Sequence, residues 1–278
     1  MDEEKLKKKE LKRIEKEEKK SLKIQKKQDK KEYRAHEKVY DIEDREARRN
    51  APLSPKELEI RRVNEAPKRS VLEEVGNSVT HGLGAIFGIV ALVLMLLKSD
   101  TPFKITGSIV YGTSMIIMML MSCLYHAFKH GLTVKRLWRR FDYSSIYLLI
   151  GGTFAPLQLV ELGQNEGHPI WAWIWFGVMW ALIIVGITFV SIFGPGRTKK
   201  INFPLYFIIG WSGLMFIPGW WNHNREILWW ILGGGIVYSL GMIPFVLKKV
   251  PSAHFIFHIF VVAGAIIQFI GIYTCVYM

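Results

Sequence analysis

The chain has 278 residues, half of them hydrophobic, and a formal net charge of +13. Residues 1–70 carry 24 basic and 17 acidic side chains, whereas residues 71–278 carry 13 and 7 and are mostly apolar. This composition excludes an ordinary soluble domain and predicts a charged arm, residues 1–70, followed by a membrane domain, residues 71–278. The two cysteines imply no disulfide framework.

The first fifty residues of the arm are dense in lysine and glutamate and contain neither glycine nor proline. Their apolar residues keep no heptad, so we expect a solvated arm, partly helical or disordered, rather than a coiled coil. Pro52, Pro55 and Pro67 then mark a linker. The basic charge favours anionic lipid head groups as partners of the arm. Because acidic residues are interspersed and no recognition motif occurs, no specific nucleic acid is expected.

Seven apolar stretches follow, each long enough to cross a bilayer, which takes about 17 to 25 residues. We therefore expect an all-α, polytopic bundle of seven transmembrane helices in a plasma membrane, most simply that of a bacterium. Tryptophans near the ends of the stretches are typical of the membrane interface. The expected spans are residues 79–97, 105–125, 143–160, 170–193, 203–220, 227–247 and 255–277.

The basic residues of the connections lie mostly on one side of the predicted bundle. The connections after the second, fourth and sixth spans carry ten of them, against three on the opposite side. By the positive-inside rule this bias, with the basic arm, places the N-terminus inside and the C-terminus outside. The connection before the third span holds five of the ten, which are Lys129, Lys135, Arg136, Arg139 and Arg140.

A pair of histidines opens the last span. His254 and His258 are four residues apart, so both fall on one helical face, a spacing that suits a shared metal ion. The predicted topology brings His126, at the end of the second span, and Asp142, in the first turn of the third, to the same membrane level. Ionisable side chains at the edge of the hydrocarbon mark a site by default.

Three imidazoles, from His126, His254 and His258, with one position left for water, form a catalytic type of zinc site. Bound zinc lowers the pKa of its water towards about 7 and can polarise a carbonyl. Asp142 would orient or deprotonate that water, and Ser122, four residues before His126, lies on the same helical face. Imidazole ligands also suit iron or nickel.

Simpler interpretations of the same residues stay open. Asp142 can cap the start of the third span, or pair with Arg139 or Arg140. Ser122 can donate a hydrogen bond back to the carbonyl of Met118.

The other histidines have less direct roles. Asn77 and His81 start the first span at the level of the site, but we interpret His81 as a polar residue at a helix entry. His130 is expected to be solvated in the basic connection, and His168 and His223 to lie on the other side of the membrane.

Four ordered motifs resemble those of the hemolysin III family. They are EVGNSVTHG at residues 74–82, SCLYH at 122–126, FDYSSIYLLIGGTFAP at 141–156 and HFIFH at 254–258. That family is related to the progestin and adipoQ receptors and, more remotely, to alkaline ceramidases. The resemblance runs from about residue 73 to the C-terminus and leaves out the arm.

The resemblance implies a seven-helix bundle with a zinc ion at its cytoplasmic side. Its ligands would be His126, His254 and His258, with Asp142 holding the zinc water and Ser122 in support. Tyr143 and Gln268 stand where relatives commonly have histidine. The residues that would surround and support the ligands are Glu74, Asn77, His81 and Tyr143.

Three functions follow, and we favour the first. It is an integral-membrane, zinc-dependent hydrolase of a lipid amide or ester, with a membrane lipid as substrate or ligand. The second, a cytolysin or pore, rests on the family name and is opposed by the missing signal peptide and amphipathic strand pattern. The third is a receptor or membrane sensor with a structural metal and the arm as a docking element.

Overall fold

The structure is a computed structural model that describes residues 17, 21–23, 25–32, 52–246 and 252–278. The chain divides into two compact units, Met1–Leu58 and Glu59–Met278. The described residues between 17 and 32 are helical and exposed. Most of the arm lies outside the described residues, so its expected conformation and its boundary at residue 70 stay predictions.

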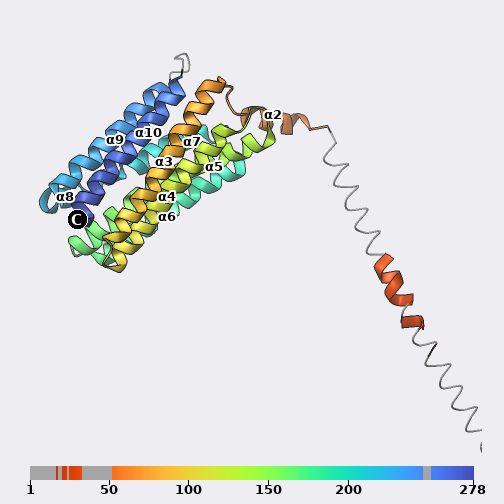
Figure 1. Cartoon of the computed structure of the whole chain (residues 1–278), viewed down its shortest axis with the longest axis horizontal. Helices are drawn as coiled ribbons and strands as arrows, with labels where there is room; N and C mark the ends of the chain where they lie inside the picture. Colours follow the sequence, from red (N-terminus) through yellow and green to blue (C-terminus); the bar gives the residue numbers. More distant parts are fainter. Residues whose placement is uncertain (1–16, 18–20, 24, 33–51, 247–251) are drawn as a thin grey trace, which may run out of the picture. The chain divides into compact units, whose positions relative to one another are not determined.

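The described residues form helices, and seven of these are long and apolar enough to cross a membrane (Figure 1). The all-α, seven-span fold is thereby confirmed. A short helix, α2 (Pro55–Val63), precedes the spans. The spans are α3 (Val71–Leu97), α4 (Pro102–Ala127), α5 (Thr133–Pro156) continued by η1 (Leu157–Asn165), α6 (Pro169–Phe193), α7 (Lys199–Trp211) continued by η2 (Ser212–Phe216) and α8 (Ile217–His223), α9 (Arg225–Val246), and α10 (Ala253–Ile272) continued by η3 (Tyr273–Tyr277).

Local sequence sets where the spans begin and end. The hydroxyl of Ser70 accepts a hydrogen bond from the N–H of Glu73 and caps α3, and Thr101 caps α4 in the same way. Gly194 ends α6 with φ at 82°, a left-handed conformation that glycine adopts without steric cost.

Two expected span boundaries are wrong. The first span begins at Val71 rather than at residue 79, and the third begins at Thr133 rather than at residue 143. Hydropathy windows miss these extensions because they contain polar residues, of which Asn77, Lys135 and Arg139 are buried inside the protein. Asp142 therefore lies in the third turn of α5, not in its first. Four basic residues expected in the connection, Lys135, Arg136, Arg139 and Arg140, lie in α5.

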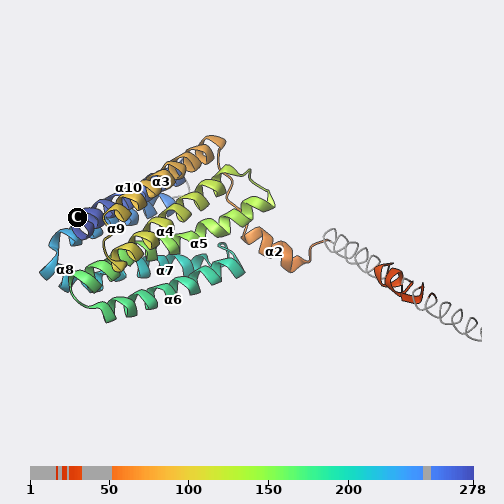
Figure 2. The same cartoon turned by 60° about the horizontal axis from the view of Figure 1, so that its bottom comes forward.

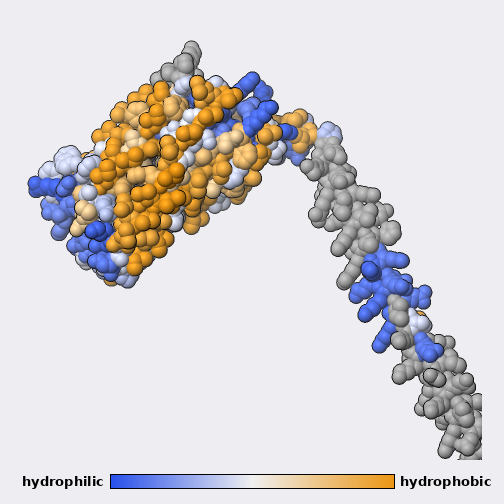
Figure 3. Space-filling model, in the orientation of Figure 1, coloured by the Kyte–Doolittle hydropathy of each residue, from blue (hydrophilic) through white to orange (hydrophobic). Residues whose placement is uncertain are grey.

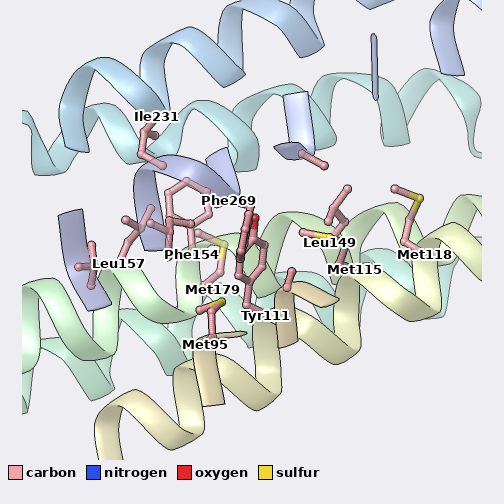
Figure 4. Packing of buried hydrophobic residues seen from close by; sticks show 14 of the residues in the cluster. Met95, Tyr111, Met115, Met118, Leu149, Phe154, Leu157, Met179, Ile231 and Phe269 are labelled. Carbon is pink, nitrogen blue, oxygen red and sulfur yellow. The ribbon is translucent and has the colours of Figure 1, made fainter. Parts of the chain in front are cut away.

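The helices pack mainly as neighbours in the chain. α3 lies along α4, α4 along α5, and α9 along α10, while α10 returns to contact α3 (Figures 1 and 2). Buried methionines and aromatic rings, among them Met95, Tyr111 and Phe154, fill the space between them (Figure 4). Outside, a hydrophobic band separates two hydrophilic ends of the bundle (Figure 3). We call the end where α4 stops and α10 starts the histidine end, and the other the far end.

Candidate metal centre

Three imidazole rings meet at the histidine end. His126 comes from the last turn of α4, and His254 and His258 from the first two turns of α10. The Nε2 atom of His254 lies 3.3 Å from that of His126 and 3.2 Å from that of His258. The ligating atoms of all three residues lie within 4.8 Å of one another. The predicted spacing of the HFIFH motif thus brings both of its rings to one point.

The spacing of these nitrogens fits a metal ion. Two nitrogens bound to one tetrahedral zinc, each at 2.0–2.1 Å, would be about 3.3–3.4 Å apart. The two observed separations, 3.3 and 3.2 Å, are close to that value. Neutral imidazoles facing one another through Nε2 share too few protons to satisfy every nitrogen. The cluster can therefore hold a metal ion, and imidazole suits zinc among others.

Hydrogen bonds behind His126 fix its ring. Its Nδ1 atom lies 2.5 Å from Oε2 of Glu74, and the amide of Asn77 is 3.3 Å away. A carboxylate that accepts the Nδ1 proton selects the tautomer whose Nε2 lone pair is free for a metal. The other carboxylate oxygen of Glu74 accepts from Nζ of Lys135 at 2.8 Å.

Lys135, which was expected in a connection, is a buried cation of α5. Its ammonium also donates to the carbonyl of Phe128 at 2.8 Å and lies 4.9 Å from the ring centre of Tyr125. The side chain is fully buried. Lys135, Arg139 and Asp142 follow the i, i+4, i+7 pattern of one helical face, which was the signal available in the sequence.

His81 joins the cluster, so its interpretation as a helix-entry residue is wrong. Because α3 begins at Val71, His81 lies well inside the helix. Its ring stacks on that of His258, with centroids 3.8 Å apart and an interplanar angle of 25°. Both of its ring nitrogens are buried without a hydrogen-bond partner among the described residues.

Asp142 and Ser122 lie beside the histidines. Both line the same cavity as His254 and His258. Asp142 is not an N-cap, because α5 begins at Thr133.

The two arginines considered as partners of Asp142 bond elsewhere. Arg139 donates to the carbonyls of Asn64 and Glu65 at 3.0 and 2.9 Å, and Arg140 donates to that of Ser191. Neither of the simpler roles considered for Asp142, a helix N-cap or an ion pair with Arg139 or Arg140, is therefore observed.

An apolar cavity extends from the histidines along the bundle. It runs between α5, α7, α9 and α10 and encloses about 1520 Å³ of empty space, its open side included. On α9 its lining reaches from Phe245 to Leu228, a helical rise of about 25 Å. Tyr143 and Gln268 both line it.

The remaining histidines stay apart from the cluster. His130 is exposed, with Nε2 2.8 Å from the carbonyl of Ala66. His168 precedes α6 and His223 ends α8, so both belong to the far end. His36 lies outside the described residues.

The fold and the site define a seven-helix membrane protein with a candidate metal centre at one end. Residues 69–269 match the family described as Haemolysin-III related. The chain belongs to this family, as the motifs of its spans predicted.

Curated relatives agree with that assignment. The chain is 37% identical over 203 residues to Hemolysin-3 of Bacillus cereus, covering 72% of this chain and 90% of the relative. It is 31% identical over 204 residues to the Hemolysin-3 homolog of Bacillus subtilis, covering 72% and 92%. It is also 26% identical over 216 residues to the human monocyte to macrophage differentiation factor, covering 76% and 87%. With seven apolar helices and such bacterial relatives, the protein is a multi-pass cell-membrane protein.

Proposed function

We propose that the protein is a zinc-dependent hydrolase of a lipid amide or ester. The observation that carries this proposal is the meeting of three histidines at the mouth of a long apolar cavity, with two of their Nε2–Nε2 separations at the spacing of tetrahedral zinc. A bilayer-embedded cavity of this kind suits the acyl chain of a lipid. A metal ion at its mouth suits attack on the carbonyl group of that lipid.

Each residue of the site would have its own role in hydrolysis. His126, His254 and His258 would hold the ion, which when bound supplies an activated water and polarises a carbonyl. Asp142 would accept the proton of the attacking water and pass it to the leaving amine or alcohol. Ser122 would hold the Asp142 carboxylate in place.

The proposal also assigns a side of the membrane. The basic connections and the basic arm favour a cytoplasmic histidine end, with the N-terminus inside and the C-terminus outside. Anionic lipid head groups would then be the natural partners of the arm.

One observation favours a sensor as the second candidate. The segment that leads from the arm into α3, residues 64–69, which we call the strap, is tied to α5 by Arg139. Arg139 is three residues before Asp142 on α5. A displacement of the strap would therefore act on Arg139 and, through the helix, on the position of Asp142. In that case the metal would be structural and the arm would carry the signal.

Hydrolysis is tested with the detergent-purified, zinc-loaded protein and a panel of lipid amides and esters that includes a ceramide. Asp142→Asn is expected to lower turnover by about 10²- to 10⁴-fold while metal content stays unchanged. Asp100→Asn, the same change at an exposed position just before α4, is the control. If a metal-free His126→Ala protein still hydrolysed these lipids, the proposal of a zinc-dependent hydrolase would be contradicted.

A further inference from the structure

The cavity contains two polar side chains for which the protein supplies no partner. Tyr238 on α9 and Gln268 on α10 both line it. The hydroxyl of Tyr238 is buried and has no hydrogen-bond partner among the described residues. Gln268 is 8% exposed, and its amide makes no hydrogen bond within the described part of the chain but is not among the fully buried polar groups. A polar group unpaired in an apolar interior is costly, so each calls for an explanation.

Two glycines make room for these side chains on adjacent turns of the helix pair. A Cβ atom at Gly264 would lie 3.0 Å from the ring of Tyr238, and one at Gly234 would lie 2.3 Å from Cγ of Gln268. Gly234 and Tyr238 are four residues apart on α9, as Gly264 and Gln268 are on α10. Because the two helices run antiparallel, Tyr238 and Gln268 occupy neighbouring levels of one seam.

The seam lies deep in the membrane, away from the metal centre. Gly264, which supports Tyr238, is six residues beyond His258 on α10, a rise of about 9 Å. Gln268 is ten residues beyond His258, a rise of about 15 Å. The hydroxyl of Tyr111 on α4, within electrostatic range of Tyr238, is like that of Tyr238 fully buried without a partner among the described residues. Figure 4 shows Tyr111 among the buried side chains between the helices.

We propose that Tyr238 and Gln268 form a subsite for a hydrogen-bonding group partway along an acyl chain, such as a mid-chain hydroxyl. A phenol and a carboxamide each donate and accept, so together they suit a hydroxyl, which also does both. The inference rests on the proposed function only in that an acyl chain occupies the cavity. It assigns the substrate class as hydroxylated acyl lipids.

The experiment compares ricinoleic acid with oleic acid, which differ by one mid-chain hydroxyl. Each acid displaces a fluorescent fatty acid from the full chain purified in detergent. The protein is expected to bind ricinoleic acid about three- to tenfold more tightly, the worth of one net hydrogen bond. Tyr238→Phe and Gln268→Leu should each reduce the preference, and the double variant should abolish it.

A matched control separates binding from general disturbance. Tyr147→Phe removes a buried hydroxyl that donates to Asn202 at 3.2 Å and lies outside the cavity lining, so it should keep the preference. Equal affinities for the two acids, or a preference that survives in the double variant, would overturn the subsite while leaving a lipid cavity. Failure of both acids to bind would overturn the subsite and the acyl-chain cavity together. A ricinoleic acid preference in protein that binds no metal would uphold the subsite and contradict the hydrolase.

Discussion

The two ends of the bundle satisfy their polar groups in different ways. At the far end several polar side chains form separate pairs, while Gln158 Oε1 and Trp220 Nε1 are buried without a partner among the described residues. Asn165 donates to Glu161 at 2.7 Å, and Thr101 donates to Gln164 at 2.5 Å. The hydroxyl of Tyr277 donates to a backbone carbonyl at 3.0 Å. Each of these three donors meets an acceptor, so these pairs need no ligand, and the unpaired atoms of this end do not converge on one point.

At the histidine end the groups converge instead. The Nε2 atoms of His126, His254 and His258 face one another, and His81 stacks against His258 with both ring nitrogens unpartnered among the described residues. Nitrogen lone pairs that meet at one point are satisfied by a cation. The comparison shows what distinguishes a candidate metal site from an ordinary helix end. It is the convergence of several nitrogen lone pairs on one point, rather than the number of polar residues.

The largest expected effect comes from removing the buried cation behind the cluster. Lys135→Met leaves the Glu74 carboxylate and the Phe128 carbonyl without their donor. Breaking such a pair should lower the free energy of unfolding by about 3 kcal/mol. Thermal unfolding in detergent measures the loss. Lys129→Met, at an exposed position of the α4–α5 connection, should leave the transition near that of the wild type.

The next effect concerns the metal rather than the fold. Glu74→Gln replaces the carboxylate that accepts the Nδ1 proton of His126 with a weaker acceptor. Affinity for zinc, measured by competition with a chromogenic chelator, should fall about 10- to 100-fold. Glu73→Gln makes the same change one residue earlier and should not alter affinity. Wild-type affinity in Glu74→Gln would show that the carboxylate does not tune the ligand.

A smaller effect is expected from the strap. The amide of Asn64 donates to the carbonyls of Ile60 and Phe193 and accepts from the N–H of Gly196. Asn64→Ala should cost about 1–3 kcal/mol of unfolding free energy, because buried backbone groups lose their partner. Asn222→Ala, at an exposed position of α8, is the matched control in the same thermal measurement. An unchanged transition in Asn64→Ala would show that the strap does not hold the histidine end.

The smallest effect belongs to the far end and depends on pH. Burial, with repulsion from Glu161, raises the pKa of Glu166 above its usual value of 4.5, against the attraction of His223 and His168. The folded state therefore binds this proton more tightly than the unfolded state, so Glu166 adds stability as pH falls from neutrality towards 4.5. Relative to Glu166→Gln, the wild type should gain thermal stability over that range. A difference that stays constant with pH would contradict this assignment.

The sequence predicted much of the fold and the metal ligands. Apolar stretches longer than a bilayer is thick predict spans directly, and the four-residue spacing of His254 and His258 predicts one shared face. The topology then brought His126 to the same level. These inferences depend on local pattern and membrane geometry, which a single sequence contains.

The missed features depend on contacts between distant segments. Glu74 was found only through a family motif, since its bond to His126 joins different helices. Lys135 and Arg139 lie in a helix turn too polar for a hydropathy window, and His81 became part of the cluster because α3 starts earlier than expected. The packing of Tyr238 on Gly264 and of Gln268 on Gly234 depends on how α9 is aligned along α10. Hydrophobic periodicity does not contain that alignment.

The central claim is that the histidine end binds a metal ion and the far end does not. The direct measurement is metal content of the detergent-purified protein by mass spectrometry, for the wild type, His258→Ala and His168→Ala. We predict about one zinc ion per chain in the wild type and in His168→Ala, and none in His258→Ala. Zinc retained by His258→Ala, or a metal-free wild type prepared without chelators, would contradict the claim.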